Sequence, residues 1–488
     1  MSESEIIKVY QEGIQSVISL VQGLSTQISE LSQTVSDLDA RLKKLEKQSN
    51  QTSQNSSLPP STDGFKKTKS LRQPSNKKTG GQVGHKGSTL KMVEDPDLVV
   101  THHPQTCQGC GCCLENVEPQ KTIRRQVFDL PSLRLQVTEH QSQIKVFDLS
   151  PLNIQVTEHQ ALIKVCPNCY YKNEGPFPKH VTQPTQYGPH LTSVLSYLSH
   201  YQLIPFNRLK QLTQDIFRLT ISQGTLVNMT KRFYELLETT EASIKENLLA
   251  SSYLHLDETG CYVNGKRQWL HVTSNKRYTH YFIHEKRGSQ AIEANGILPS
   301  FKGTVIHDHW TPYFKYDDCT HALCNVHHLR EFKGIIEFEN QQWAKDMTEL
   351  LLEAKTYSEE TEYPLPLSKI QEFEKRYQQI IEEGYRENPL KLHEKNTDSV
   401  RLLNRLSKRQ EEVLEFLYQV EVPFDNNLAE RDVRMTKTKQ KISGCFRTEK
   451  GAHCFARIRG FISTCQKQGL NIIESIETIL MGNTIQFS

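Results

Sequence analysis

Apolar residues recur with a heptad period at the start of the chain. Between residues 7 and 48 they occupy the a positions (Ile14, Val21, Ile28, Val35 and Leu42) and the d positions (Val17, Leu24, Leu31, Leu38 and Leu45). β-Branched residues at a with Leu at d favour a parallel two-stranded coiled coil. Residues 1–48 are therefore predicted to form a helix that pairs with a second copy of the chain. The alternative is a single amphipathic helix packed on the chain's own core.

The apolar pattern disappears between residues 49 and 100. Turn-forming and polar residues dominate there, as in NSSLPPSTD and GGQVGHKGSTL, and leave almost nothing to bury. Residues 64–93 contain eight Lys or Arg and no acid. We predict a flexible basic linker that either contacts DNA phosphates or simply connects its neighbours.

A tandem repeat follows, in which residues 127–145 and 146–164 match at thirteen of 19 positions. The alternating LxLQV or LxIQV core of each copy predicts a strand, and the two copies together an enlarged hairpin arm. The repeat separates two CxxC pairs, Cys107 with Cys110 and Cys166 with Cys169. This spacing suits a tetrahedral structural Zn²⁺ site, so residues 101–182 are predicted to form a zinc-binding domain. Cys112 and Cys113 leave the choice of ligands open.

Residues 183–248 are predicted to form short helices. The first spans Leu191–Tyr201, the second Phe206–Phe217, and the third starts at the capping residue Ser222. Lys231 and Arg232 lie in the third helix and are candidate DNA contacts. Helices joined by tight turns fit a helix-turn-helix motif, and a plain helical subdomain fits them as well.

Alternating strand patterns begin near residue 252. Residues 252–263, 267–274 and 277–286 predict consecutive antiparallel strands, residues 303–308 a fourth strand, and residues 321–332 a strand that runs into a helix. This order indicates an α/β fold with a mixed sheet. Residues 333–408 are acid-rich and lack strand signals, which predicts a helical insertion.

The stretch Asp425–Lys441 predicts a helix with an unusual charged face. Pro423 ends the preceding segment, and Asp425 can accept hydrogen bonds from free backbone N–H groups. Glu430, Arg434, Lys437 and Lys441 follow one another at helical spacing on one face. The face is either a salt-bridged surface or a metal-binding acid beside a track for DNA phosphates.

The net charge of +3 hides an uneven distribution. Residues 431–460 hold nine bases against two acids, whereas residues 334–416 hold eighteen acids against twelve bases. Basic blocks on either side of an acidic middle indicate a nucleic-acid partner. The start MSESEIIK has no signal-peptide pattern, and no apolar run approaches the ~20 residues of a membrane helix. We expect a cytoplasmic protein without a membrane partner, whose cysteines are thiols or metal ligands.

Three acids on separate predicted elements could form a catalytic site. Asp257 lies in the first strand of the sheet, Asp308 ends the fourth strand, and Glu430 lies on the helix after the insertion. Such a set could hold two Mg²⁺ ions for phosphodiester chemistry. His307 and His309 also permit a transition-metal site.

Several of these stretches resemble the large transposase of the TnpC type, from bacterial insertion-sequence family sixty-six. The similar segments are NSSLPPSTD, GGQVGHKGSTL, the CxxC pairs, HLDET, the HD pair at 307–308, CNVHHLRE, DNNLAERDVR, KISG and the later ARIRGFISTC. The resemblance implies an RNase H-like catalytic domain over residues 249–460, followed by a C-terminal element over 461–488. It further implies that Asp257, Asp308 and Glu430 form a DDE triad that binds Mg²⁺ or Mn²⁺. Lys437 matches a basic position near the transposon end, and the role of Cys324 with His327 stays open.

The resemblance implies a DNA transposase associated with the bacterial nucleoid, acting on insertion-sequence ends and target DNA. It also implies small accessory proteins of the same element as partners. The tandem repeat departs from the family pattern, so we weigh an alternative. A non-catalytic, dimeric, zinc-containing DNA-binding protein derived from a transposase would explain the coiled coil and the cysteines, but not the three acids.

Overall fold

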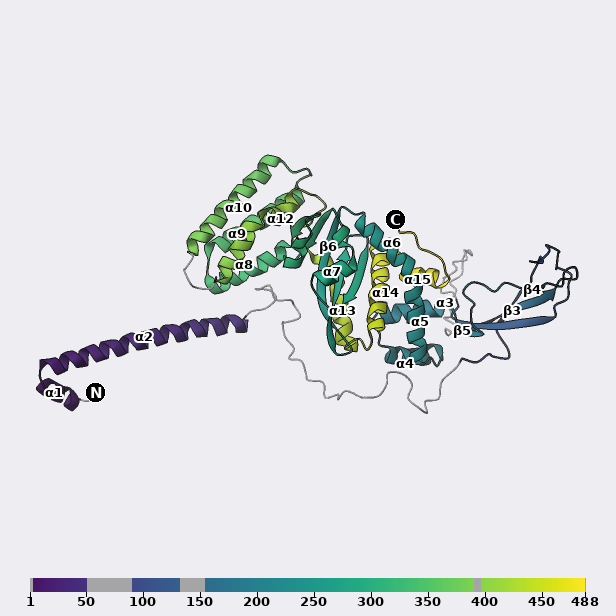
Figure 1. The fold of residues 1–488 in the computed structure, drawn as a ribbon, viewed down its shortest axis with the longest axis horizontal. Helices are drawn as coiled ribbons and strands as arrows, with labels where there is room; N and C mark the ends of the chain where they lie inside the picture. Colours follow the sequence, from purple (N-terminus) through teal and green to yellow (C-terminus); the bar gives the residue numbers. More distant parts are fainter. Residues whose placement is uncertain (1–2, 51–89, 132–153, 390–395, 488) are drawn as a thin grey trace, which may run out of the picture. The chain divides into compact units, whose positions relative to one another are not determined.

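The computed structural model describes residues 3–50, 90–131, 154–389 and 396–487 (Figure 1). Contacts divide the chain into two compact units. One comprises Leu71–Cys324 with Gln419–Ser488, and the other comprises Met1–Ser70 with Asn325–Tyr418. Most of the predicted basic linker and the middle of the tandem repeat lie outside the described residues.

The first sheet of the larger unit carries the cysteine pairs. Its strands are β1 (Leu98–His102), β2 (Lys121–Asp129), β3 (Gln155–Val165), β4 (Lys172–Glu174) and β5 (Thr185–Tyr187). The strand order is β1-β3-β2-β5, and β4 pairs with β3. β2 and β3 are antiparallel, with Asp129 opposite Gln155. The hairpin therefore joins the first residues of one repeat copy to the last residues of the other, and the strand predicted in the first copy lies outside the described residues.

Helices follow this sheet much as the sequence predicts. α3 (Pro189–Ser196) continues into the π-helical turn η2 (Tyr197–Tyr201), and α4 (Phe206–Phe217) and α5 (Gln223–Leu236) come next. The side chain of Ser222 accepts a hydrogen bond from the backbone N–H of Thr225, which confirms the predicted cap of α5. α3, α4 and α5 share one apolar cluster that includes Leu191, Leu209 and Leu226.

The second sheet forms the centre of the larger unit. Its strands are β6 (Tyr253–Val263), β7 (Lys266–Ser274), β8 (Thr279–His284), β9 (Thr304–His307) and β10 (Thr320–Leu323), in the order β10-β9-β6-β7-β8. β6, β7 and β8 form an antiparallel meander, whereas β9 is parallel to β6 and β10 is parallel to β9. β8 is shorter than predicted because the side chain of Asn275 accepts hydrogen bonds from Arg277 and Tyr278 and holds them in the turn before it.

Helices cover both faces of this sheet (Figure 1). α13 (Asn427–Ser443) and α14 (Glu449–Lys467) pack on one face, where Val433 and Phe455 meet Leu270 and Val272. The other face is covered at one end by α6 (Glu238–Leu249), α7 (Ser289–Asn295) and the short helices η3 (Leu298–Ser300) and η4 (Thr311–Lys315). α15 (Ile472–Leu480) and α5 pack against the far side of α14. Because α14 is buried between the sheet and these two helices, it fixes the sheet to α5 and α15.

The other unit contains only helices in the described residues. α8 (Asn325–Glu339), α9 (Gln342–Glu360), α10 (Leu367–Glu387), α11 (Asp398–Lys408), α12 (Gln410–Leu414) and η5 (Glu415–Leu417) enclose a core around Trp343, Phe373 and Tyr377. The predicted insertion lies within this all-helical segment.

The N-terminal heptad segment is helical but not continuous. α1 (Glu3–Gln11) ends before Gly13, whose φ of +105° breaks the helix, and α2 (Ile14–Asn50) begins directly after it. The prediction of an unbroken heptad helix from residue 7 is wrong at this point. Along α2 the heptad side chains other than Val17 are exposed, for example Ile14 at 79%, Ile28 at 64% and Leu45 at 63%. They pack on no core of the chain in the described residues.

The direct pairing of β2 with β3 predicts that one copy of the repeat is dispensable. Deleting residues 131–149 leaves one complete copy of the repeat and shortens the connection between β2 and β3. The entropic cost of closing this connection on folding becomes slightly smaller. We expect the free energy of unfolding, measured in urea, to change by less than about 1 kcal/mol. A deletion of the same length over residues 155–173 removes β3 and should abolish the cooperative transition. Loss of folding in the first variant would contradict this account of the hairpin.

Candidate functional site

Asp257 lies in the middle of β6 on the face that α13 covers. It pairs across the sheet with Val272, whose side chain packs with Val433 of α13. Cross-strand partners point to the same face, so the Asp257 side chain is directed toward the helix. Its Oδ1 accepts a hydrogen bond of 2.7 Å from the backbone N–H of Glu258.

Asp308 follows the last residue of the neighbouring strand, β9. The parallel register pairs His255 with Ile306, and its continuation by two residues sets Asp257 level with Asp308. The next residue, His309, has a φ of +71°, which turns the chain sharply away from the strand. The backbone N–H of Trp310 then donates to Asp308 Oδ1 at 3.2 Å. The turn thus holds the carboxylate at the end of β9.

Glu430 lies in the first turn of α13. Ala429 and Val433, on either side of it, are buried in the apolar cluster between the helix and the sheet. The carboxylate is 13% exposed, and its Oε2 lies 3.6 Å from Arg434 Nη2. The backbone N–H of Asn427 donates to Asp425 Oδ1 at 2.9 Å, so Asp425 satisfies a free N–H group at the helix start, as predicted.

The three carboxylates are close enough to interact electrostatically. Burial, followed by the negative charges of Glu258, Asp308 and Glu430, raises the pKa of Asp257 well above its usual 3.8. In the described part of the chain, some side chains bring three or more ligand atoms within 4.8 Å of one another. Asp257, Asp308 and Glu430 do not form such a group. The negative charges of these acids repel one another, and a divalent cation would relieve that repulsion. Their oxygen donors are the kind that Mg²⁺ prefers.

Asn426 was not anticipated from the sequence, and it joins the elements that carry these acids. Its amide Nδ2 donates to the carbonyl of Leu256 at 2.8 Å, and its Oδ1 lies 2.8 Å from Nδ1 of His255. Its backbone N–H donates to Sγ of Cys324 at 3.1 Å. Asn426 is 1% exposed, so these bonds form in a dry environment where breaking them is costly. The start of α13 is thereby fixed to β6 immediately before Asp257.

Cys324 lies directly after β10, near the same acids. Its Sγ and a carboxylate oxygen of Glu430 lie within 4.8 Å of each other. In this unit Cys324 therefore stands beside the third acid and accepts the hydrogen bond from Asn426. His327 belongs to α8 of the other unit.

Glu258 is a second acid that the sequence analysis overlooked. Its carboxylate is 1% exposed and forms an ion pair with Arg287, whose Nε donates at 2.8 Å. The hydroxyl of Tyr313 donates to its other oxygen. Burial and the charge of Asp308 raise the pKa of Glu258 to about 7, although Arg287 opposes the shift. The adjacent positions 257 and 258 thus direct one acid to each face of the sheet.

The predicted basic residues of α13 have different surroundings. Arg434 is 63% exposed, beside Glu430. Nζ of Lys437 donates to the carbonyl of Gly260 at 2.8 Å, so this residue also ties α13 to β6. Lys441 is exposed near the end of the helix. On α5, the predicted DNA contacts Lys231 and Arg232 are both exposed.

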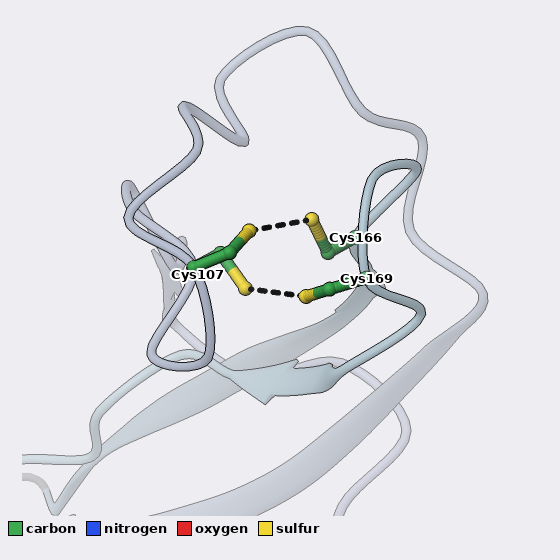
Figure 2. Close-up of side chains that lie close together, drawn as sticks. Cys107, Cys166 and Cys169 are labelled. Atoms are coloured by element: carbon green, nitrogen blue, oxygen red, sulfur yellow. Dashed lines mark hydrogen bonds between the residues drawn. The ribbon is translucent and has the colours of Figure 1, made fainter.

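The two CxxC pairs come together at one end of the first sheet (Figure 2). Sγ of Cys107 lies 3.5 Å from Sγ of Cys169, and Sγ of Cys110 lies 3.6 Å from Sγ of Cys166. All four sulfur atoms are within 4.8 Å of one another. Four thiolates in this arrangement fit a tetrahedral Zn²⁺ ion with no open position.

Both cysteine turns have the same backbone design. The residue after each second cysteine has a positive φ, +76° at Gly111 and +58° at Tyr170. Its N–H donates to the carbonyl of the first cysteine in the pair, at 2.8 Å to Cys107 and at 2.9 Å to Cys166. Cys112 and Cys113 follow the first turn, outside the four-sulfur group, which resolves the ligand choice that the sequence left open.

Nearby N–H groups prepare Cys107 to ionise. Burial disfavours its thiolate, but N–H donors from the turn and from Asn173 outweigh burial and lower its pKa to about 6. Donors to sulfur stabilise the charged form that binds metal. Asn173 comes from β4, so the second layer of the site is built by the strand that follows the second cysteine pair.

Comparison with known proteins places the chain in a family. The model of the family described as "Transposase IS66 family" matches residues 184–454, more than half of the chain. The chain belongs to this family of transposases. The match covers β6 to β10, α13 and all three acids of the candidate site. The predicted family resemblance is thereby confirmed.

Two further similarities concern smaller parts of this IS66-family chain. Residues 14–91 match a family of unknown function, DUF6444. The chain is also 38% identical over 74 residues to "Uncharacterized protein y4jO" of Sinorhizobium fredii, a match that covers 15% of this chain and 23% of that protein. The chain thus spans about a quarter of the length of this curated relative.

Within the described ranges, none of the helices combines the length and the apolar character that crossing a bilayer requires.

The raised pKa of Asp257 predicts a pH-dependent stability. The folded protein holds this proton more tightly than the unfolded chain does, so stability falls as pH rises from 3.8 through the raised pKa. Asp257→Asn keeps a hydrogen-bond acceptor for the Glu258 N–H but has no proton to lose. In magnesium-free buffer we expect this variant to be more stable than the parent at pH 8, with the difference shrinking toward pH 4 in urea titrations. An equal difference in stability between the variant and the parent at both pH values would show that the pKa of Asp257 is not raised.

Proposed function

We propose that the protein is a DNA transposase that cuts the ends of an insertion sequence and joins them to target DNA. The observation that carries this proposal is the joint position of the acids. The register of β6 with β9 sets Asp257 level with Asp308, and Asn426 holds the helix of Glu430 against them. The sheet order, three antiparallel strands followed by two parallel ones, supports an RNase H-like catalytic domain.

We infer that Asp257, Asp308 and Glu430 hold divalent cations, Mg²⁺ or Mn²⁺. Bound as a pair, such ions stabilise the attacking and the leaving oxygen in an in-line phosphodiester displacement. Asp257 and Asp308 offer their oxygens from adjacent strand positions, and Glu430 offers its oxygens from the helix above them. The same residues would serve strand cleavage by water and the later attack of the freed 3′-hydroxyl on target DNA.

The basic residues around this site have distinct proposed tasks. Arg434 and Lys441 are exposed on α13 and would contact DNA phosphates. Lys437 is bound to the Gly260 carbonyl, so its proposed DNA contact requires it to exchange that bond for a phosphate. Lys231 and Arg232 on the exposed side of α5 would contact DNA from the α3–α5 helical region, as a helix-turn-helix motif would.

The proposal also includes dimerisation, a structural Zn²⁺ ion and accessory proteins. The exposed heptad seam of α2 supports dimerisation through a parallel coiled coil. The four-sulfur group supports a structural Zn²⁺ ion bound by Cys107, Cys110, Cys166 and Cys169. Small accessory proteins of the same element are further proposed partners, and the nucleoid of a bacterial cytoplasm is the proposed location.

Strand cleavage tests the proposal. Asp257→Asn and Glu430→Gln each remove a carboxylate from the site, and we expect either to reduce Mg²⁺-dependent nicking of DNA carrying the element's terminal repeats about 10³-fold. Binding to the same DNA should persist, because the proposed phosphate contacts Arg434 and Lys441 are unchanged in both variants.

Glu474→Gln is the matched control, since Glu474 is an exposed acid on α15. It should cleave like the parent. Cleavage that survives both Asp257→Asn and Glu430→Gln would refute the two-metal site. A parent protein that binds the ends but never cleaves them would instead favour the non-catalytic DNA-binding alternative.

A further inference from the structure

Two of the chain's three tryptophans lie in a stack with two arginines. The Trp–Arg stack consists of Arg267 and Trp269 on β7, Arg287 after β8 and Trp310 after β9. The Arg267 guanidinium lies 4.4 Å from the centre of the Trp269 ring. Arg287 lies 4.9 Å from the Trp269 ring and 4.2 Å from the Trp310 ring. Planar cations and aromatic rings thus alternate across three separate segments of the chain.

The stack lies on the sheet face opposite α13 and α14. Trp269 is opposite Gly260 on β6 and His284 on β8, whereas the next residue, Leu270, points into the core beneath α13. A Cβ atom at Gly260 would lie 3.3 Å from Nε of Arg267. The Arg267 side chain therefore extends over β6 at a position without a side chain. The absence of bulk at Gly260 gives the guanidinium its place beside Trp269.

Two contacts connect the stack to the candidate active site. The backbone N–H of Trp310 donates to Asp308 Oδ1 at 3.2 Å. Arg287 forms its ion pair with Glu258, the residue that follows Asp257. Trp310 of the stack is thus bonded to Asp308, and Arg287 of the stack is paired with the residue next to Asp257.

The two arginines differ in how their charge is balanced. Glu258 compensates Arg287, which is 37% exposed. Arg267 is exposed, and within the described part of the chain it has no ion pair. A stack that only braced the turn after β9 would need Arg287 and Trp310, but not Arg267 at its outer end. The outer end presents to solvent the planar guanidinium of Arg267, whose positive charge no acid in the described residues balances.

We propose that the Trp–Arg stack binds an unpaired nucleotide of the cleaved DNA strand, on the sheet face opposite the one that α13 covers. The base stacks on the outer face of the Arg267 guanidinium, whose inner face lies against Trp269, and the adjoining phosphate pairs with an arginine. Aromatic rings and guanidinium planes bind unpaired bases of any sequence, because every base has a flat face. This inference rests on the proposed transposase function, since strand cleavage beside Asp308 produces the unpaired end that the stack would hold.

The test separates base stacking from phosphate binding. Fluorescence anisotropy compares the Kd of the full chain for a labelled ten-nucleotide oligothymidylate with its Kd for a ten-residue abasic oligonucleotide, at one low salt concentration. Both probes carry the same phosphates, so the ratio of the two Kd values reports on the bases alone. We expect the parent to prefer the thymidylate by about 10-fold.

Arg267→Lys is the most informative variant, because it keeps the charge at an exposed position but loses the plane. It should lower the base preference at least about threefold while changing the abasic Kd by less than about twofold. Arg277→Lys, an exposed arginine in the turn at the opposite end of β7, is the matched control and should leave both Kd values unchanged. Trp269→Ala should remove the preference, and Trp269→Phe should retain part of it.

The base preference does not depend on the cleavage activity. Glu430→Gln should keep the full base preference, so a failed two-metal site and a failed Trp–Arg stack give different results. A preference that Arg267→Lys and Trp269→Ala both leave intact would overturn the inference. So would a parent protein that binds the abasic and the thymidylate probes equally.

Discussion

The buried amide of Asn426 joins the strand of Asp257 to the helix of Glu430. Residues 255 and 426 are far apart in the chain, and their contact is maintained by hydrogen bonds to His255 and to the Leu256 carbonyl. Lys437 reinforces the junction four residues further along β6, where it donates to the Gly260 carbonyl. Because α13 is thus bonded to β6 on both sides of Asp257, the position of Glu430 follows from the position of the strand. The candidate site depends on this junction more than on any local motif.

The junction forces like charges together, and the surrounding structure accommodates them. Asp257 has its pKa raised by burial and by the acids around it. Glu258 points to the other face, where Arg287 compensates it and belongs in turn to the Trp–Arg stack. The sheet therefore separates two environments. On one face Asp257 lies among other negative charges, which suits divalent ions. On the other face an arginine offsets the acid, and the Trp–Arg stack is available to a nucleotide.

Local pattern predicted the elements better than their connections. The bounds of α4, the cap of α5 and the strands that carry Asp257 and Asp308 follow from residues close in sequence. The break at Gly13 was missed because apolar periodicity continues through it while the backbone does not. Asn426, Glu258 and the Trp–Arg stack could not be found in this way, because their partners come from strands and turns distant in the chain. The four cysteines of the proposed zinc site were predicted from their spacing, but only the pairing of β2 with β3 explains how they meet across the repeat.

The central claim is that three acids from β6, β9 and α13 form one divalent-cation site. Binding of Mn²⁺ to the zinc-loaded protein, followed by the electron paramagnetic resonance signal of the free ion, tests it most directly. The account predicts that Asp257→Asn, Asp308→Asn and Glu430→Gln each weaken Mn²⁺ binding at least about 10-fold, since each removes one of three charged ligands. Mn²⁺ affinity that is the same in the parent and in all three variants would contradict it.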